Sequence, residues 1–180
     1  MANAPFASLA DLRDVESRNH HAQAVAAGAD PDAVLAAIRP VSRDNARTPV
    51  QWDATEHAGF TTGTPWIAVN PDHTEWNAQA QREDPDSVLA HYRRLIALRH
   101  EEPVVALGDF AMLLPEHEDV YAFTRTLEGE VLLVVCNLSR TPYPLADLLP
   151  QAVGARLVLG NLPDAGDTLR PWEARVLRET

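Results

Sequence analysis

The stretch 130-EVLLVVCNLS-139 decides how the second half of the chain folds. Residues Val131 to Cys136 are all apolar, which is typical of a strand that lies at the centre of a sheet and is covered on both faces. The residues before it, Leu127-Glu128-Gly129-Glu130, have the character of a hairpin tip. The sequence therefore predicts a central strand here, entered from a hairpin.

Other short segments around this strand also have the character of strands. The candidates are 109-DFAMLLPE-116, 119-DVYAFTRT-126, 155-ARLVLG-160 and 172-WEARVLR-178, which are separated by turn residues. A proline-rich gap runs from Thr141 to Pro150. Short strands at this spacing predict an antiparallel β-sandwich.

A helix precedes the strands, in 83-EDPDSVLAHYRRLIALRH-100. We expect Asp84 to be its N-cap and Pro85 its first helical residue. The apolar residues at helical spacing predict a buried stripe, which comprises Val88, Leu89, Tyr92, Leu95 and Ile96. From Pro103 the period changes from helical to alternating. We therefore predict a boundary near Glu102, with residues 1–102 in one domain and an all-β domain over residues 103–180.

The first half of the chain reads as helices and long loops. Ser8 can cap one helix, and Asp30 followed by Pro31 can begin another that ends before Pro40. Residues 41–80 show no sustained period, and a stretch of that length without structure is usually functional or disordered. Its three tryptophans argue against disorder because such large side chains are normally packed; they are Trp52, Trp66 and Trp76.

Within that stretch, 42-SRDNARTPVQWD-53 concentrates recognition chemistry. Arg43 and Arg47 can each form forked hydrogen bonds to a carboxylate or to neighbouring hydroxyls. Asp44 and Asn45 suit polyol recognition, and Trp52 offers a flat apolar wall for a sugar.

Two other interpretations of this loop remain open. In one, the loop is structural, and its arginines pair with Asp44 and Asp53. In the other, these two acids are a catalytic pair, which in a retaining glycosidase stands about 5–5.5 Å apart.

Composition excludes several classes of function. The 180 residues carry a formal charge of -11, which argues against nucleic acid as a partner. No apolar run reaches the roughly 20 residues that span a bilayer, so no membrane partner is expected, and the N-terminus lacks the pattern of a signal peptide. A single cysteine, Cys136, fits a reducing compartment and predicts a cytoplasmic location. The histidines do not cluster and no nucleotide-binding motif is present, so neither a metal nor a cofactor is predicted.

The segment 42-SRDNARTPVQWDATEHAGFTTGTPWIAVNPDH-73 closely resembles the signature of the α-glucosidase and oligo-1,6-glucosidase branch of the α-amylase superfamily, glycoside hydrolase family 13. In the usual form of that signature a methionine stands where this chain has Val50. The resemblance continues backwards through 5-PFASLADLRDVESRN-19 and forwards through the helix near residue 90. The ending 169-LRPWEARVL-177 resembles the last strand of the family's C-terminal domain.

This resemblance implies a fold class. Members of the family are (β/α)8 barrels with a C-terminal antiparallel β-domain, and a barrel alone takes about 250 residues. The chain is therefore expected to begin after the eighth barrel strand. The predicted class is α+β: helices and loops from the end of a (β/α)8 barrel over residues 1–102, then an antiparallel β-sandwich over residues 103–180.

The resemblance also implies a function. Arg43 matches the arginine that lines the glucose pocket of these enzymes and pairs with an upstream aspartate. Arg47 is the second choice for a substrate contact, and Asp44, Asn45 and Trp52 are expected to brace the loop. The family's nucleophile, acid/base and transition-state-stabilising carboxylates lie upstream, so no catalytic residue is assigned and the chain is not expected to be active by itself.

We expect the chain to be the C-terminal portion of a retaining α-glucosidase that hydrolyses terminal α-linked glucose. Its partners would be an α-glucoside oligosaccharide and the missing N-terminal barrel portion. One alternative is a fragment of a sucrose isomerase or a trehalose-phosphate hydrolase. The other is a stand-alone, non-catalytic sugar-binding or structural β-sandwich module, which would leave apolar residues exposed at Leu9, Leu12, Val34, Leu35, Tyr92 and Ile96.

Overall fold

The structure, a computed structural model, describes residues 3–163 and 166–179. The chain divides into two compact units, Met1–Pro85 and Asp86–Thr180, which we call the N-terminal unit and the C-terminal unit. The helix before residue 102 groups with the C-terminal unit, whereas the boundary predicted near Glu102 separates barrel from β-domain and stays a prediction.

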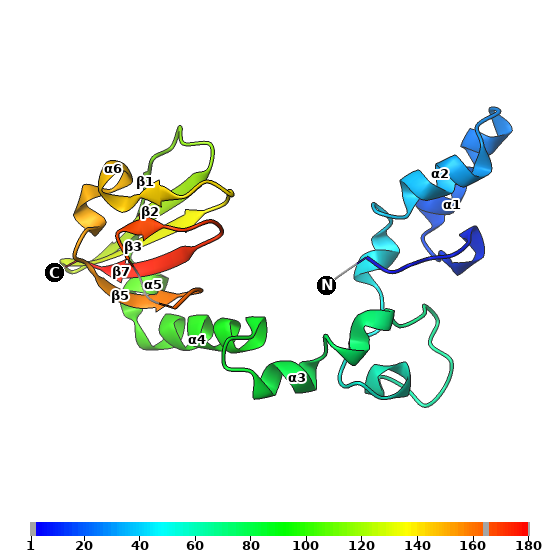
Figure 1. The fold of residues 1–180 in the computed structure, drawn as a ribbon, viewed down its shortest axis with the longest axis horizontal. Helices are drawn as coiled ribbons and strands as arrows, with labels where there is room; N and C mark the ends of the chain where they lie inside the picture. Colours follow the sequence, from blue (N-terminus) through cyan, green and yellow to red (C-terminus); the bar gives the residue numbers. More distant parts are fainter. Residues whose placement is uncertain (1–2, 164–165, 180) are drawn as a thin grey trace. The chain divides into compact units, whose positions relative to one another are not determined.

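Two helices open the N-terminal unit, α1 (Val15–Ala26) and α2 (Pro31–Ile38) (Figure 1). α2 begins as predicted, because the Asp30 carboxylate accepts a hydrogen bond from the Ala33 N–H at 3.0 Å and Pro31 occupies the first turn. The helix predicted after Ser8 is wrong in extent. Ser8 caps only a 3-10 turn, Leu9–Asp11, after which Leu12 is extended (φ -77°, ψ 134°) and fully buried.

Short turns fill the rest of this unit, with 3-10 helices at Arg43–Ala46, Glu56–Gly59 and Pro71–Thr74. A six-residue helix follows, α3 (Ala78–Glu83), capped by the Asn77 side chain, which accepts a hydrogen bond from the Ala80 N–H at 2.9 Å. The sequence reading missed α3 because six residues are too few to show a helical period.

The N-terminal unit has its own apolar core, which consists of Ala4, Phe6, Leu12, Leu35, Ile38 and Ile67, with Leu9 and Val34 packed against it. The expectation that Leu9, Leu12, Val34 and Leu35 would be left exposed is therefore wrong. These side chains pack on one another and on Ile67, which lies in the long loop region.

The C-terminal unit contains a five-stranded antiparallel sheet in the order β1-β2-β3-β7-β5 (Figure 1). Its strands are β1 (Asp109–Leu113), β2 (Val120–Leu127), β3 (Glu130–Asn137), β5 (Arg156–Gly160) and β7 (Ala174–Arg178), which confirms the five predicted segments, with β3 at the centre. The predicted hairpin tip joins β2 to β3, where Leu127 pairs with Glu130. Glu128 (φ 50°) and Gly129 (φ 88°) form its two-residue turn.

One face of this sheet is covered by a second layer. That layer consists of α6 (Leu145–Leu148), a 3-10 turn (Pro150–Ala152), and a small sheet formed by β4 (Tyr143–Pro144) and β6 (Thr168–Leu169). We call this face of the large sheet the inner face. The side chains that join the layers are Val120, Ala122, Leu133, Val135 and Leu177 from the sheet and Leu145, Leu149, Ala152 and Leu169 from the second layer.

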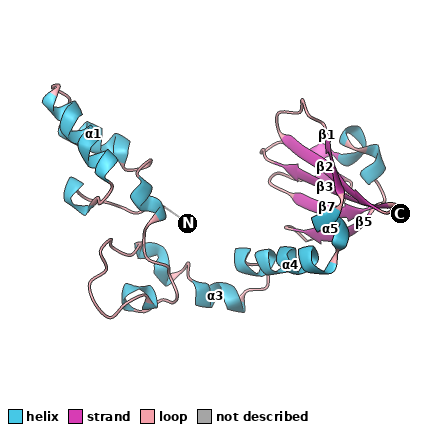
Figure 2. Cartoon of the chain, turned by 180° about the vertical axis from the view of Figure 1, so that it is seen from behind, coloured by secondary structure: helices cyan, strands magenta, loops and turns pink. Residues whose placement is uncertain are grey.

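The opposite face, which we call the outer face, carries the short helix α5 (Pro103–Leu107) (Figure 2). The Arg125 guanidinium donates a hydrogen bond to the Ala106 carbonyl at 3.3 Å, and Arg178 forms an ion pair with Glu102 at 2.7 Å. The expectation that residues after Pro103 begin an alternating pattern is wrong, because Pro103 begins one more helical turn before β1.

The helix α4 (Val88–Glu101) begins three residues later than predicted. Its N-cap is Ser87, whose Oγ accepts a hydrogen bond from the Ala90 N–H at 3.1 Å, so the assignment of Asp84 and Pro85 is wrong. The predicted stripe is wrong as well, because most of it is exposed: Val88, Tyr92, Leu95 and Ile96. Among the described residues, no helix is long and apolar enough to cross a bilayer.

Candidate functional site

The loop that carries the recognition chemistry is built on the 3-10 turn Arg43–Ala46. Ser42 precedes the turn, and its Oγ accepts a hydrogen bond from the Asp44 N–H at 3.3 Å. The tight turn sends successive side chains in different directions. Asp44 and Asn45 are buried, whereas Arg43 is exposed.

Asp44 ties this turn to the start of α1. Its Oδ2 accepts hydrogen bonds from the backbone N–H groups of Arg13 (2.5 Å) and Asp14 (2.8 Å), and its Oδ1 lies 3.3 Å from Nη1 of Arg47. The side chain is fully buried, and a buried carboxylate is stable only when donors of this kind replace water. The position of the loop is thereby fixed to residues some thirty positions upstream.

Asn45 ties the same turn to the N-terminal segment. Its Oδ1 accepts a hydrogen bond from the Ala4 N–H at 2.9 Å, and its Nδ2 donates to the Arg39 carbonyl at 2.8 Å. Both amide atoms are thus engaged within the unit.

Arg43 and Glu16 form an ion pair on the outside of this frame. Arg43 Nη2 lies 2.9 Å from Glu16 Oε2, and the two side chains are 67% and 72% exposed. A pair this exposed adds little stability, but it restricts the directions in which the guanidinium can point. The exposed fraction leaves the guanidinium accessible to a ligand.

An open hollow of about 690 Å³ lies beside this pair. It is lined by Arg13, Asp14, Val15, Glu16, Asn19, His20, Gln23, Arg43 and Arg47. The structure therefore brings together Arg43 and Arg47, the two predicted substrate contacts, with a row of polar side chains from α1.

The sequence reading missed the contribution of α1. Glu16, Asn19, His20 and Gln23 are spaced i, i+3, i+4 and i+7, which places them on one face of the helix. This spacing is a polar helical period, and it marks one face of a helix in the sequence as an apolar period would. At the start of α1, a hydrogen bond from the Ser17 hydroxyl (2.7 Å) lowers the pKa of Asp14 despite its burial.

Trp52 and Asp53, at the end of the loop, do not line this hollow. The Trp52 N–H donates to the Ala58 carbonyl at 2.9 Å, and its ring is about half exposed. Hydrogen bonds from the hydroxyl and the N–H of Thr55 lower the pKa of Asp53. Asp44 and Asp53 are thus held by different partners.

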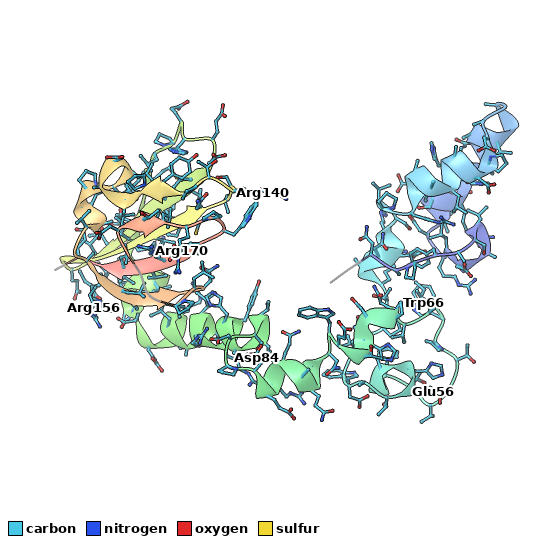
Figure 3. The ribbon with its side chains drawn as sticks, in the orientation of Figure 1. Glu56, Trp66, Asp84, Arg140, Arg156 and Arg170 are labelled. Carbon is cyan, nitrogen blue, oxygen red and sulfur yellow. The ribbon has the colours of Figure 1, made fainter. Side chains whose placement is uncertain are left out.

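A second hollow, of about 580 Å³, shares Arg13 with the first. Its lining includes Trp66, His57 and His73, and Arg13 Nε donates a hydrogen bond to the Trp66 carbonyl at 3.1 Å. The Trp66 ring is exposed on the N-terminal unit (Figure 3). Within residues 3–163 and 166–179, no three histidine, cysteine or acidic side chains are grouped so as to hold a metal ion.

Comparison with known proteins identifies the family to which the chain belongs. Residues 14–108 match the family model of the α-amylase catalytic domain. The chain belongs to the α-amylase family. Residues 110–176 match the model of the maltogenic amylase C-terminal domain. The family resemblance and the fold class predicted from the sequence, a catalytic-domain portion followed by an antiparallel β-domain, are confirmed.

The relatives within the α-amylase family include several enzymes. The chain is 41% identical to oligo-1,6-glucosidase of Parageobacillus thermoglucosidasius, over 99% of this chain and 33% of that protein. It is also 41% identical to trehalose-6-phosphate hydrolase of Bacillus subtilis, over 100% of this chain and 33% of the relative. The chain therefore spans about a third of the length of these relatives.

Solved structures of the α-amylase family match as well. Trehalose-6-phosphate hydrolase of Bacillus licheniformis superposes with a TM-score of 0.86 at 36% identity, over 99% of this chain and 34% of that one. Trehalulose synthase of Pseudomonas mesoacidophila gives a TM-score of 0.86 at 38% identity, over 100% of this chain and 34% of its own. The chain is accordingly a portion of a glycoside hydrolase family 13 enzyme.

Proposed function

We propose that this chain is the C-terminal portion of a retaining α-glucosidase that removes terminal α-linked glucose from oligosaccharides. The hollow beside α1 forms one wall of its glucose pocket, with Arg43 as the principal substrate contact and Arg47 as the second. Asp44, Asn45 and Trp52 brace the loop. An α-glucoside is the substrate, and the rest of the barrel is the partner.

The observation that carries this proposal is the contrast between Arg43 and its neighbours. The side chains of Asp44 and Asn45 are buried and form hydrogen bonds within the unit. The Arg43 guanidinium, by contrast, is exposed and is oriented by Glu16 at the edge of the hollow. A planar cation in that setting can hold a carboxylate and still donate to sugar hydroxyls. The buried neighbours fix its backbone, so little entropy is lost when a sugar binds.

The reaction requires two carboxyl groups, one of which must be a general acid with a raised pKa. Among the described residues, each carboxylic acid whose pKa departs from its ordinary value is shifted downwards: Asp11, Asp14, Asp53 and Glu173. Such groups remain carboxylates at neutral pH and make poor proton donors. We therefore assign nucleophile and acid/base to the part of the relatives that this chain does not match, and expect no turnover by the chain alone.

Relatives named for different reactions match equally well, at 41% identity for both an oligo-1,6-glucosidase and a trehalose-6-phosphate hydrolase. A trehalose-phosphate hydrolase is therefore the second candidate, and hydrolysis of trehalose 6-phosphate, compared with isomaltose, discriminates between the two. A cytoplasmic location remains a prediction from the single cysteine.

The test joins this full chain to the N-terminal two thirds of the Parageobacillus thermoglucosidasius relative and measures hydrolysis of a nitrophenyl α-glucoside. Arg43→Ala should lower kcat/KM by about 10- to 150-fold, the range expected when one or two charge-assisted hydrogen bonds are lost. Arg18→Ala is the matched control, because Arg18 is an exposed arginine of α1 outside the hollow. Equal kcat/KM values for the Arg43 and Arg18 variants would refute the proposed role of Arg43.

A further inference from the structure

The second hollow of the N-terminal unit, of about 580 Å³, has the lining of a site for a small polar ligand, and we call it the Trp66 hollow. Its volume falls in the range of ligand pockets, about 300–1,000 Å³. Trp66 supplies a flat apolar surface. Asp11, Arg13 and His73 supply polar groups. An aromatic face beside a few polar groups suits a sugar, because a sugar ring has apolar C–H groups on its faces and hydroxyls around its edge.

Trp66 is held in place by its own backbone. The Trp66 carbonyl accepts a hydrogen bond from Arg13 Nε at 3.1 Å, and the next residue, Ile67, is buried in the core of the unit. The Trp66 ring is nevertheless 58% exposed (Figure 3). A ligand that stacks on this ring would remove apolar surface from water, and it would cost little conformational entropy because the backbone is already fixed.

The turn that carries His57 is strained. His57 (φ 52°), Ala58 (φ 56°) and Gly59 (φ 64°) are three consecutive residues in the left-handed region, which glycine alone adopts readily. The surrounding structure imposes this conformation, because Ala58 is fully buried and its carbonyl accepts a hydrogen bond from the Trp52 N–H at 2.9 Å. Strain of this kind is often found at ligand-binding sites, and here it places His57 in the lining of the Trp66 hollow.

The polar groups of the Trp66 hollow match a neutral ligand that carries hydroxyls. Asp11 Oδ2 accepts hydrogen bonds from the N–H (2.8 Å) and the hydroxyl (3.1 Å) of Ser8, and these bonds lower the pKa of Asp11. His73 Nδ1 lies 3.0 Å from the Asn70 carbonyl, so in the neutral ring Nδ1 carries the hydrogen and Nε2 is an acceptor. Asp11 and His73 are thus acceptors and Arg13 is a donor, which suits hydroxyls, whereas the Asp11 carboxylate disfavours an anion.

Arg13 connects the Trp66 hollow to the hollow beside Arg43. It lies in the lining of both. Its N–H donates to Asp44, the residue that fixes the Arg43 turn, and its Nε donates to the Trp66 carbonyl. The two hollows therefore share a wall, and an oligosaccharide whose terminal glucose contacts Arg43 can extend its remaining units past Arg13 towards Trp66.

We propose that the Trp66 hollow is a carbohydrate-binding site, which takes a glucosyl unit of the oligosaccharide beyond the terminal glucose at Arg43, with the sugar ring stacked on the Trp66 indole. The inference rests on the proposed function, because the ligand is the substrate of that enzyme. It assigns a role to Trp66, His57 and His73, which do not line the hollow beside Arg43. It also implies a preference of the enzyme for oligosaccharides over disaccharides.

Nuclear magnetic resonance of the isotope-labelled full chain tests sugar binding directly. Each of the four tryptophans gives a separate indole N–H signal, and Trp66→Phe identifies the Trp66 signal by its loss. The chain is titrated with isomaltotriose, a neutral trimer of glucose. Trp76 is the internal control, because its ring is 65% exposed and it lines neither hollow.

We expect the Trp66 signal to shift until it saturates and the Trp76 signal to stay in place. Loss of one hydrogen bond in His73→Ala should weaken the apparent affinity by about fivefold. The control His100→Ala, at an exposed histidine outside the hollow, should leave the affinity within about twofold. The proposal is overturned if the Trp66 signal does not move, if both signals move alike, or if both histidine variants bind equally. The wild-type titration decides the matter where a variant does not fold.

The chain joined to the N-terminal two thirds of the Parageobacillus thermoglucosidasius relative extends the test to catalysis. There Trp66→Ala should lower kcat/KM for isomaltotriose by about tenfold and leave kcat/KM for a nitrophenyl α-glucoside, which has a single glucosyl unit, within about threefold. Trp76→Ala should change neither value by more than about threefold. Equal losses on both substrates would overturn the proposal, by assigning Trp66 to packing against the rest of the barrel. A joined enzyme that hydrolyses neither substrate refutes the proposed function alone, because the titration needs no turnover.

Discussion

Replacing Asp44 with alanine should unfold the frame that positions Arg43. The substitution removes the acceptor for two backbone N–H groups, those of Arg13 and Asp14, and the partner of Arg47. Each buried N–H left without an acceptor costs about 1–3 kcal/mol, so we expect a loss of about 3–5 kcal/mol in the free energy of unfolding of the N-terminal unit. A domain is typically stable by only about 5–15 kcal/mol, so little stability would remain.

The amide variant separates hydrogen bonding from charge. Both N–H groups reach the same oxygen, Oδ2, so Asp44→Asn can still accept them and should lose only about 1–2 kcal/mol, through its amide facing Arg47. Urea unfolding followed by tryptophan fluorescence measures these losses in a Trp172→Phe background, because the remaining tryptophans all lie in the N-terminal unit.

Asp32→Ala is the control for Asp44→Ala, because Asp32 is exposed in the first turn of α2 and should cost about 0.5 kcal/mol or less. The reasoning fails if Asp44→Ala costs less than 1 kcal/mol, or if the asparagine variant is the less stable of the two.

Two further predictions concern backbone and charge. Gly59 (φ +64°) has no room for a Cβ, which would lie 2.5 Å from the Asp53 carboxylate. Gly59→Ala should therefore lower the free energy of unfolding, measured in urea, by about 2 kcal/mol or more. Gly28→Ala, whose Cβ meets open space, is the control and should lower it by about 1 kcal/mol. Burial would raise the pKa of Glu173, but hydrogen bonds from Arg170 and Arg175 lower it from 4.5 to about 2. The ionised Glu173 should contribute about 3 kcal/mol to the free energy of unfolding of the C-terminal unit above pH 4.5, and this contribution should be lost as the pH falls to 2. Urea unfolding followed by Trp172 fluorescence should show the loss. Glu173→Gln should not show it.

The strands were predictable because their signal is local. Alternation, or an unbroken apolar run as in Val131 to Cys136, marks a strand whatever lies around it. The tip Glu128-Gly129 is equally local, since its two positive φ angles favour glycine. The start of α4 was harder to predict, because Asp84 and Ser87 lie three residues apart and both residue types are good N-caps. The choice between them depends on how the preceding turn closes.

Burial could not be predicted in the same way, because it depends on a partner. The stripe of α4 has the helical spacing of a buried face, yet Tyr92 and Ile96 are exposed in this chain. Leu12 and Leu35 were expected to be open and instead meet Ile67, which lies in a region without any periodic signal. For the site, Arg43 was found through a motif, whereas Glu16 became visible only when α1 was placed beside it.

The bracing of the loop limits how this recognition element can be moved between proteins. Asn45 depends on Ala4, Asp44 depends on Arg13, and Gln51 donates to the Trp76 carbonyl at 2.6 Å. An engineer who transplants residues 42–53 alone would leave every one of these supports behind. The N–H groups of Ala78 and Gln79 also donate to the carbonyls of Gln51 and Trp52. The smallest block that carries its own supports therefore extends from residue 4 to residue 79, so swapping of specificity among related enzymes should proceed by exchange of that whole block.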